Sequence, residues 1–161
     1  MIDFDQTFIA KDGEAVFDDR KDAGLSIRVP TTMAVKTNQG GQIINSDGLM
    51  NSKAWSQPAK WCDYHGPVEG EHLGIAFLNH PTSHRFPTRW HVRDYGLFTA
   101  NPFGQRAFIR KLEPNPTRIQ KGEKLQLRHR FIFHTGDAAS ADIESAWQQY
   151  AKEGAGDEAK E

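Results

Sequence analysis

The sequence L-Q-L-R-H-R-F-I-F-H at residues 125–134 determines the expected fold. Leu, Leu, His, Phe and Phe occupy every second position from 125 to 133, and the residues between them are mostly polar. Successive side chains of a strand point to opposite faces, so this alternation is typical of a long β-strand beside a core.

The same alternation recurs at residues 25–29 and 73–77, and a shorter strand is expected at 42–45 within the polar stretch 36–59. Turn sequences such as Asp-Gly and Gly-Gly separate these segments at short intervals. Short alternating strands joined by such turns predict an all-β fold, an antiparallel β-sandwich.

One C-terminal helix is expected after the last strand. Ile143, Trp147 and Tyr150 recur at helical spacing, and either Asp137 or Ser140 is expected to cap the helix start. His129 and His134 precede this helix on the long strand, and we interpret both as structural residues.

Length and composition limit the classes of function. A chain of 161 residues predicts a single sandwich domain at 1–153 and a disordered tail at 154–161. The net charge of −1 disfavours nucleic acid as a partner. The N-terminus lacks the pattern of a signal peptide and no apolar run approaches a membrane span, so we expect no membrane contact and a cytoplasmic location.

Histidine, arginine and aromatic residues are densest between positions 79 and 103. His91 and Arg93 are expected on the opposite strand face from Trp90 and Val92, where they either bind a ligand or tie a loop to the sheet. His80 and His84 have a spacing that suits a metal only on a helix, and the prolines of this segment disfavour a helix.

A second candidate segment is W-C-D-Y-H at 61–65. Trp61, Asp63 and His65 are expected on one strand face, with Cys62 and Tyr64 on the other. Asp63 is a candidate general base or hydroxyl acceptor, or else the partner of a nearby arginine. Cys62 is expected to be a buried small residue.

These residues yield three hypotheses. The first is a carbohydrate-binding or carbohydrate-active protein that needs no cofactor and binds a sugar-like small molecule. Its catalytic groups are His80, His91 and Asp63, and its binding groups are Arg93, Tyr95, Trp61, Trp90 and His84. The second is a metal-dependent oxygenase or hydrolase that uses His80, His91 and Asp63. The third is a non-catalytic structural module.

Several motifs together resemble those of a known bacterial family. They include A-K-W-C-D-Y-H-G-P-V-E-G at 59–70, L-N-H-P at 78–81 and W-H-V-R-D-Y-G at 90–96. This set is similar to the PmoA-like family, which is named after methane oxygenase and has no known function. The resemblance implies a β-sandwich akin to the galactose-mutarotase supersandwich and, by association, a carbohydrate ligand. Methane oxidation is not expected, because a methane monooxygenase subunit of this name spans the membrane with several helices and no such span is predicted here.

The resemblance covers the C-terminal half of the family pattern, so the chain is expected to be a fragment or a shortened version. Half of a larger sandwich would leave sheet edges unpaired and apolar surface uncovered. We therefore expect self-association through exposed sheet edges.

Overall fold

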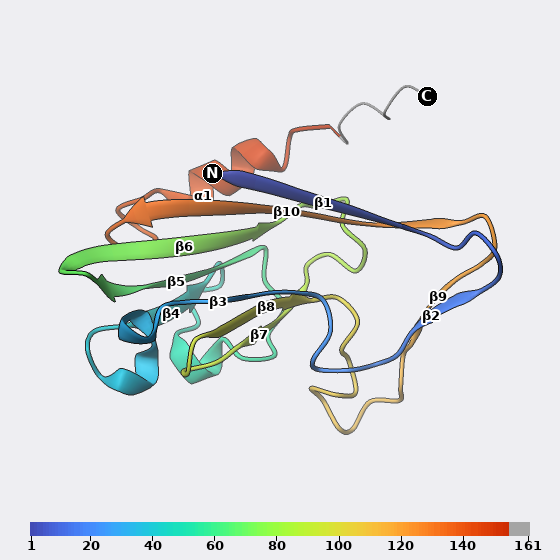
Figure 1. Cartoon of the computed structure of the whole chain (residues 1–161), viewed down its shortest axis with the longest axis horizontal. Coiled ribbons are helices and arrows are strands. Elements are labelled where there is room, and N and C mark those ends of the chain that lie inside the picture. Colours follow the sequence, from blue (N-terminus) through green and yellow to red (C-terminus); the bar gives the residue numbers. More distant parts are fainter. Residues whose placement is uncertain (155–161) are drawn as a thin grey trace.

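The computed structural model describes residues 1–154 as an antiparallel β-sandwich with one helix on its outer face (Figure 1). The larger sheet has the order β1-β10-β6-β5-β4 and the smaller has the order β3-β8-β7, while β2 and β9 form a separate ribbon. The larger sheet comprises β1 (Ile2–Ile9), β4 (Gln42–Asn45), β5 (Trp61–Val68), β6 (Glu71–Asn79) and β10 (Lys124–Thr135). The smaller sheet comprises β3 (Leu25–Arg28), β7 (Arg89–Val92) and β8 (Leu97–Asn101), and the ribbon comprises β2 (Ala15–Phe17) and β9 (Thr117–Ile119). The helices are α1 (Ile143–Tyr150) and three short 3₁₀ turns, η1 (Thr31–Met33), η2 (Val35–Thr37) and η3 (Asn51–Lys53).

The predicted all-β sandwich is confirmed, and so is the alternation on β10. Phe131 lies opposite Ile2 of β1 on one side and opposite Phe77 of β6 on the other. Directly opposite residues share a face, so these three side chains point toward the smaller sheet. The strand expected at 42–45 is β4, whereas β1, β2, β8 and β9 were not anticipated.

The core between the two sheets is centred on Phe77. Its ring contacts Phe131 of the same sheet at a centroid distance of 4.2 Å. It also meets Trp90 at 5.2 Å and Phe98 at 5.5 Å, both from the smaller sheet. These aromatic rings are fully or almost fully buried, so their packing joins the sheets.

Helix α1 covers the outer face of the larger sheet. Ile143 and Tyr150 are buried against Trp61, Ala76 and Leu78, which alternate with the core-facing residues of β5 and β6. The indole of Trp147 donates a hydrogen bond to the backbone oxygen of Asn79 at 2.9 Å. The predicted helix is therefore confirmed, and the residues at helical spacing form the face that packs on the sheet.

The expected helix cap was wrong. The residue before the helix is Asp142, which has φ 48° and makes no capping hydrogen bond through its side chain. Asp137 and Ser140 bond to each other in the preceding turn instead, where the Ser140 amide donates to the Asp137 carboxylate at 2.8 Å. Because Asp137 and Ser140 bond to each other in this turn, neither side chain caps the first amides of the helix.

Part of the inner face of the larger sheet is not covered by the smaller sheet. Ile2, Phe4 and Phe133 are 54%, 42% and 55% exposed, although they lie on the same face as the buried Phe131. The smaller sheet ends at β3, which pairs only with β8 among the described strands. Apolar surface therefore remains open beyond β3.

His129 is a buried imidazole in this core, consistent with the structural role expected from the sequence. It is fully buried next to Phe77, and among residues 1–154 neither of its ring nitrogens has a hydrogen-bond partner. Burial lowers the pKa of His129 to about 4, so the ring stays neutral in the folded protein.

We predict that His129→Leu raises the free energy of unfolding by about 1–3 kcal/mol near pH 7, because it removes two unsatisfied polar atoms. Since the folded pKa is lowered, His129 destabilises the wild type progressively as the pH falls from about 6.5 toward 4. Urea unfolding at several pH values measures both effects, with the exposed His72→Gln as the control. Equal pH dependence in wild type and His129→Leu would contradict the prediction.

Candidate functional site

The most unusual polar arrangement in the structure is a buried carboxylate between two imidazoles. Asp63 is fully buried on the outer face of β5, while its neighbours Cys62 and Tyr64 lie in the core, as their alternation predicts. The Nδ1 of His65 lies 2.6 Å from Asp63 Oδ1, and the Nε2 of His134 lies 2.7 Å from Asp63 Oδ2. A carboxylate only accepts hydrogen bonds, so each of these ring nitrogens donates a hydrogen bond to Asp63.

Strand register and one glycine bring His134 to Asp63. His134 of β10 lies opposite Gly74 of β6, and Gly74 lies opposite His65 of β5. The His134 ring leans across Gly74, where an added Cβ would be only 2.2 Å from the ring carbon Cε1. Any larger residue at position 74 would occupy the space through which His134 reaches Asp63.

The two imidazoles differ in their second nitrogen. The Nδ1 of His134 lies 3.2 Å from the backbone oxygen of Thr135, so both nitrogens of this ring face acceptors and favour the imidazolium form. Burial opposes protonation, but the hydrogen bond and the charge of Asp63 outweigh it and raise the pKa of His134. The Nε2 of His65, by contrast, has no hydrogen-bond partner within residues 1–154, and only its Nδ1 contacts Asp63.

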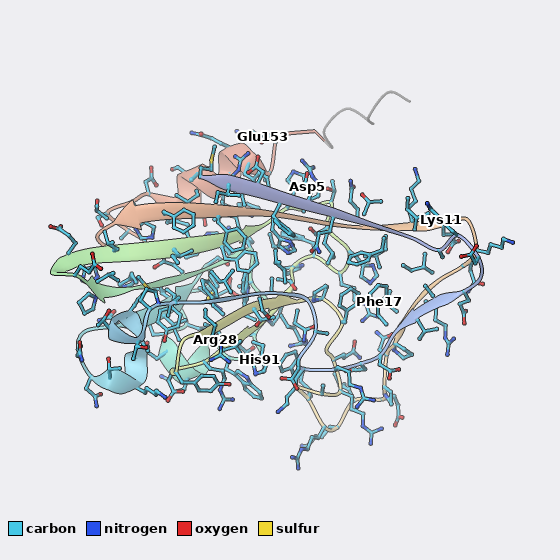
Figure 2. The ribbon with its side chains drawn as sticks, in the orientation of Figure 1. Asp5, Lys11, Phe17, Arg28, His91 and Glu153 are labelled. Carbon is cyan, nitrogen blue, oxygen red and sulfur yellow. The ribbon has the colours of Figure 1, made fainter. Side chains whose placement is uncertain are left out.

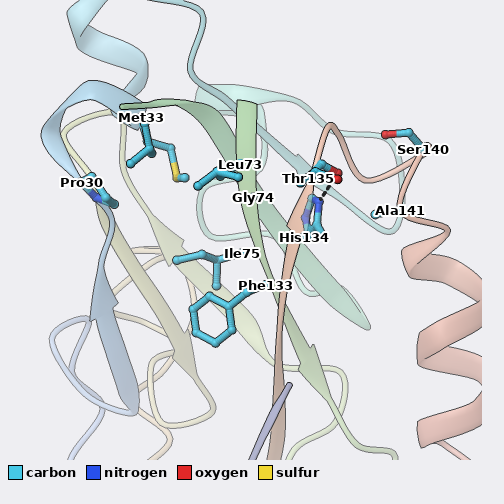
Figure 3. A pocket seen from close by; sticks show the side chains of 11 residues that line it. Pro30, Met33, Leu73, Gly74, Ile75, Phe133, His134, Thr135, Ser140 and Ala141 are labelled. Carbon is cyan, nitrogen blue, oxygen red and sulfur yellow. Dashed lines mark hydrogen bonds between the residues drawn. The ribbon is translucent and has the colours of Figure 1, made fainter. Parts of the chain in front are cut away.

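His134 of this group also lines a groove of about 780 Å³, whereas Asp63 and His65 are not among its lining residues (Figure 3). Its walls are apolar side chains, among them Met33, Leu73, Ile75 and the exposed Phe133. His134, Thr135 and Ser140 form its polar part. Leu73, Ile75 and Phe133 belong to the inner face of the larger sheet, whereas Gly74 and His134 belong to its outer face, so the groove extends over both faces. Apolar walls with a few polar groups are typical of small-molecule sites. We call the groove with Asp63, His65 and His134 the imidazole site.

His80 lies in a different environment, at the C-terminal side of α1. Its Nε2 donates to the backbone oxygen of Glu153 at 3.0 Å, and its Nδ1 accepts from the amide of Thr82 at 3.1 Å. Burial and the nearby charge of Arg128 lower the pKa of His80. Both nitrogens are used in holding backbone, so His80 is not brought together with Asp63.

His91 and Arg93 lie on the outer face of the smaller sheet, opposite Trp90 and Val92, as predicted. The Nδ1 of His91 donates to the backbone oxygen of Lys21 at 2.8 Å. Burial lowers the pKa of His91 more than the contact with Lys21 raises it. This surface is separated from Asp63 by the core and by the thickness of the larger sheet.

The remaining predicted site residues are also dispersed. Trp90 is fully buried in the core, and Trp61 is 7% exposed and donates to Glu144 of α1, so neither indole presents a ring face to a ligand. The Nε2 of His84 pairs with the Thr117 hydroxyl at 3.1 Å near the two-stranded ribbon. Tyr95 is exposed at the turn after β7. The structure therefore leaves Asp63 as the one predicted residue in the imidazole site.

Two members of the imidazole site were not recognised in the sequence. His65 was placed on the correct face without a role, and His134 was interpreted as structural. Only the pairing of β10 with β6 and of β6 with β5 shows that His134 reaches Asp63. A glycine in an alternating strand was the available signal, because it often marks a close approach of other groups.

The structure does not support the ligand set of the metal hypothesis. His91 lies on the smaller sheet, and His80 and Asp63 each bond to other groups, so the structure does not bring these three side chains together. In the part of the chain that the structure describes, no group of three His, Cys, Asp or Glu side chains has the arrangement of a metal site. No helix among those residues is long and apolar enough to cross a membrane.

Comparison with protein families gives one match, to DUF6807, a family of unknown function, over residues 1–148. The chain belongs to this family. No curated protein matches the chain, and no solved structure matches it. The match does not name the PmoA-like family that the motifs resemble, and the DUF6807 description assigns no activity or ligand.

We predict that Gly74→Ala displaces the His134 ring and breaks its bond to Asp63. Loss of a buried charge-assisted hydrogen bond should lower the free energy of unfolding by about 1.5–3 kcal/mol. The pKa of His134, measured by NMR titration, should fall from its raised value.

The same substitution in a His134→Ala background provides the control. Without the His134 ring there is no clash, so Gly74→Ala should lower the free energy of unfolding much less than it does in the wild type. Equal costs in both backgrounds would show that Gly74 does not act through His134.

Proposed function

We propose that this chain binds a sugar-like, polyhydroxyl small molecule in the groove, and that the group of Asp63, His65 and His134 transfers a proton to it through His134. The observation that carries this proposal is the pair of imidazoles on one buried carboxylate beside an apolar groove. The DUF6807 match is compatible with this function and does not assign it.

The shape and polarity of the groove support a sugar-like ligand. A sugar ring has C–H surfaces that pack on aromatic and aliphatic side chains, and Phe133 presents an exposed ring for this purpose. Hydroxyl groups of the ligand would meet Ser140, Thr135 and His134 at the polar part of the groove. The volume of about 780 Å³ lies within the range of small-molecule pockets.

The proton transfer uses the difference between the two imidazoles. The imidazolium of His134, which lines the groove, donates a proton to the ligand, while His65 holds the other oxygen of Asp63. Asp63 fixes the orientation of both rings and stabilises the positive charge on either of them. The hydrogen bond to Asp63 and its charge raise the pKa of His134, which favours the imidazolium form of this ring.

We predict that neutral mono- or disaccharides raise the melting temperature of the wild type and bind saturably in calorimetry. Phe133→Ala and His134→Gln should each weaken binding by about tenfold, since each removes one part of the contact surface. Circular dichroism checks that both variants remain folded.

His91→Gln is the matched control, because it changes a buried histidine on the other sheet and should not alter saccharide affinity. The proposal fails if no saccharide stabilises the folded wild type, or if His134→Gln and His91→Gln bind a saccharide equally well.

The uncovered inner face supports self-association as a further part of this proposal. In the described residues, β1 pairs only with β10, so its other edge carries free backbone groups beside the exposed Ile2 and Phe4. Antiparallel pairing of β1 from two copies would join the larger sheets and place these side chains next to each other.

We predict that the wild type forms dimers at micromolar or higher concentration and that the Ile2→Ser, Phe4→Ser double variant shifts the equilibrium to monomer. Light scattering after size-exclusion chromatography measures the mass across a dilution series. Val16→Ser removes a comparably exposed apolar side chain from β2 and should leave the dimer unchanged. A wild type that is monomeric throughout the series would contradict this prediction.

A further inference from the structure

Three cationic side chains surround one exposed aromatic ring on the smaller sheet, away from the imidazole site. The charged groups of Arg28, Arg93 and Lys36 lie 5.4, 5.6 and 5.8 Å from the centre of the Tyr95 ring. The ring is 37% exposed, so these groups meet at the protein surface. We call these four residues the tyrosine patch.

Backbone hydrogen bonds hold the elements of the tyrosine patch together. Tyr95 and Arg93 belong to the turn between β7 and β8, where the Arg93 amide donates to Leu97 at 2.8 Å. The Lys36 amide of η2 donates to the oxygen of Asp94 at 3.0 Å, and the Val29 amide after β3 donates to Gly96 at 3.0 Å. Three segments far apart in sequence are therefore fixed around one side chain.

These three cations lack the carboxylate partners that Arg128 and Arg130 have. Arg130 pairs with Asp3 and Glu153, and Arg128 pairs with Asp5. Within residues 1–154, none of Arg28, Lys36 and Arg93 forms a salt bridge. Asp94 is exposed in the same turn and still makes no such contact.

This local surplus of positive charge is the opposite of the chain as a whole, which has 21 acidic and 20 basic residues. The negative face of the Tyr95 ring attracts the cations but does not neutralise their mutual repulsion. Arg93 is also held by the ring of Trp55 at 5.7 Å, which limits the directions it can take. An anion bound between the cations would remove the repulsion.

We propose that the tyrosine patch binds an oxyanion, a carboxylate, sulfate or phosphate group, carried by a small organic molecule. Guanidinium groups bind such anions through paired N–H donors, and Lys36 adds a further charge. The exposed part of the Tyr95 ring offers a surface for the carbon skeleton next to the anion. Arg28 lies on the opposite face of β3 from the core-facing Leu25 and Ile27, so this site is separate from the groove.

The test uses sulfate, phosphate and glucuronate as probes, with neutral glucose as the uncharged counterpart, all at constant ionic strength. NMR titration follows the backbone amides of Tyr95 and Gly96. Saturable shifts with the three anions, and none with glucose at these amides, are the expected result. If Tyr95 supports the carbon skeleton, Tyr95→Ala should weaken glucuronate and leave sulfate unchanged.

The double variant Arg28→Gln, Lys36→Gln should weaken anion binding by about tenfold or more. Lys11→Gln is the matched control, since Lys11 is an exposed cation at the far end of the molecule, near the turn before β2 (Figure 2). The proposal is overturned if no anion gives saturable shifts, or if the double variant binds as tightly as Lys11→Gln. Neutral saccharide binding in the groove is measured independently, so either proposal can fail alone.

Discussion

The packing of Phe77 against rings from both sheets is the contact on which the rest of the structure depends. Phe131 supports it within the larger sheet, and Trp90 and Phe98 meet it from the smaller sheet. Because alternate residues of a strand point to opposite faces, placing Phe77 inward also places Gly74, Ala76 and Leu78 outward. Strand β6 therefore supplies both the surface on which α1 packs and the space that the His134 ring occupies.

The same constraint explains why the imidazole site is built on sheet strands and not on loops. Asp63 and His65 both adjoin the core-facing Tyr64, so their backbone cannot shift without disturbing the core, and His134 is held beside them by the pairing of β10 with β6. Groups on rigid elements keep their relative distances, which is a requirement for proton transfer. The tyrosine patch, in contrast, lies on a turn and two neighbouring segments, which backbone hydrogen bonds hold together.

The sequence was sufficient for the fold class and for the faces of individual strands. The positions of Trp90, Val92, Cys62 and Tyr64 followed from alternation alone. It was not sufficient for the site, because His134 and Asp63 are 71 residues apart and meet only through strand pairing that no local pattern encodes. The high density of histidine at 79–103 did not locate the site either. Buried imidazoles such as His80 also hold backbone segments in place, and a sequence does not distinguish this use from a binding role.

The order of strands in the larger sheet has a consequence for how the protein is made. β1 precedes the other strands of this sheet in sequence, yet its partner is β10, and Ile2 lies opposite Phe131. Asp3 likewise finds its partner only when Arg130 arrives, and that guanidinium also binds Glu153. During translation the apolar residues of β1 therefore remain unpaired until β10 has been made, and the joining of these two strands depends on long-range contacts.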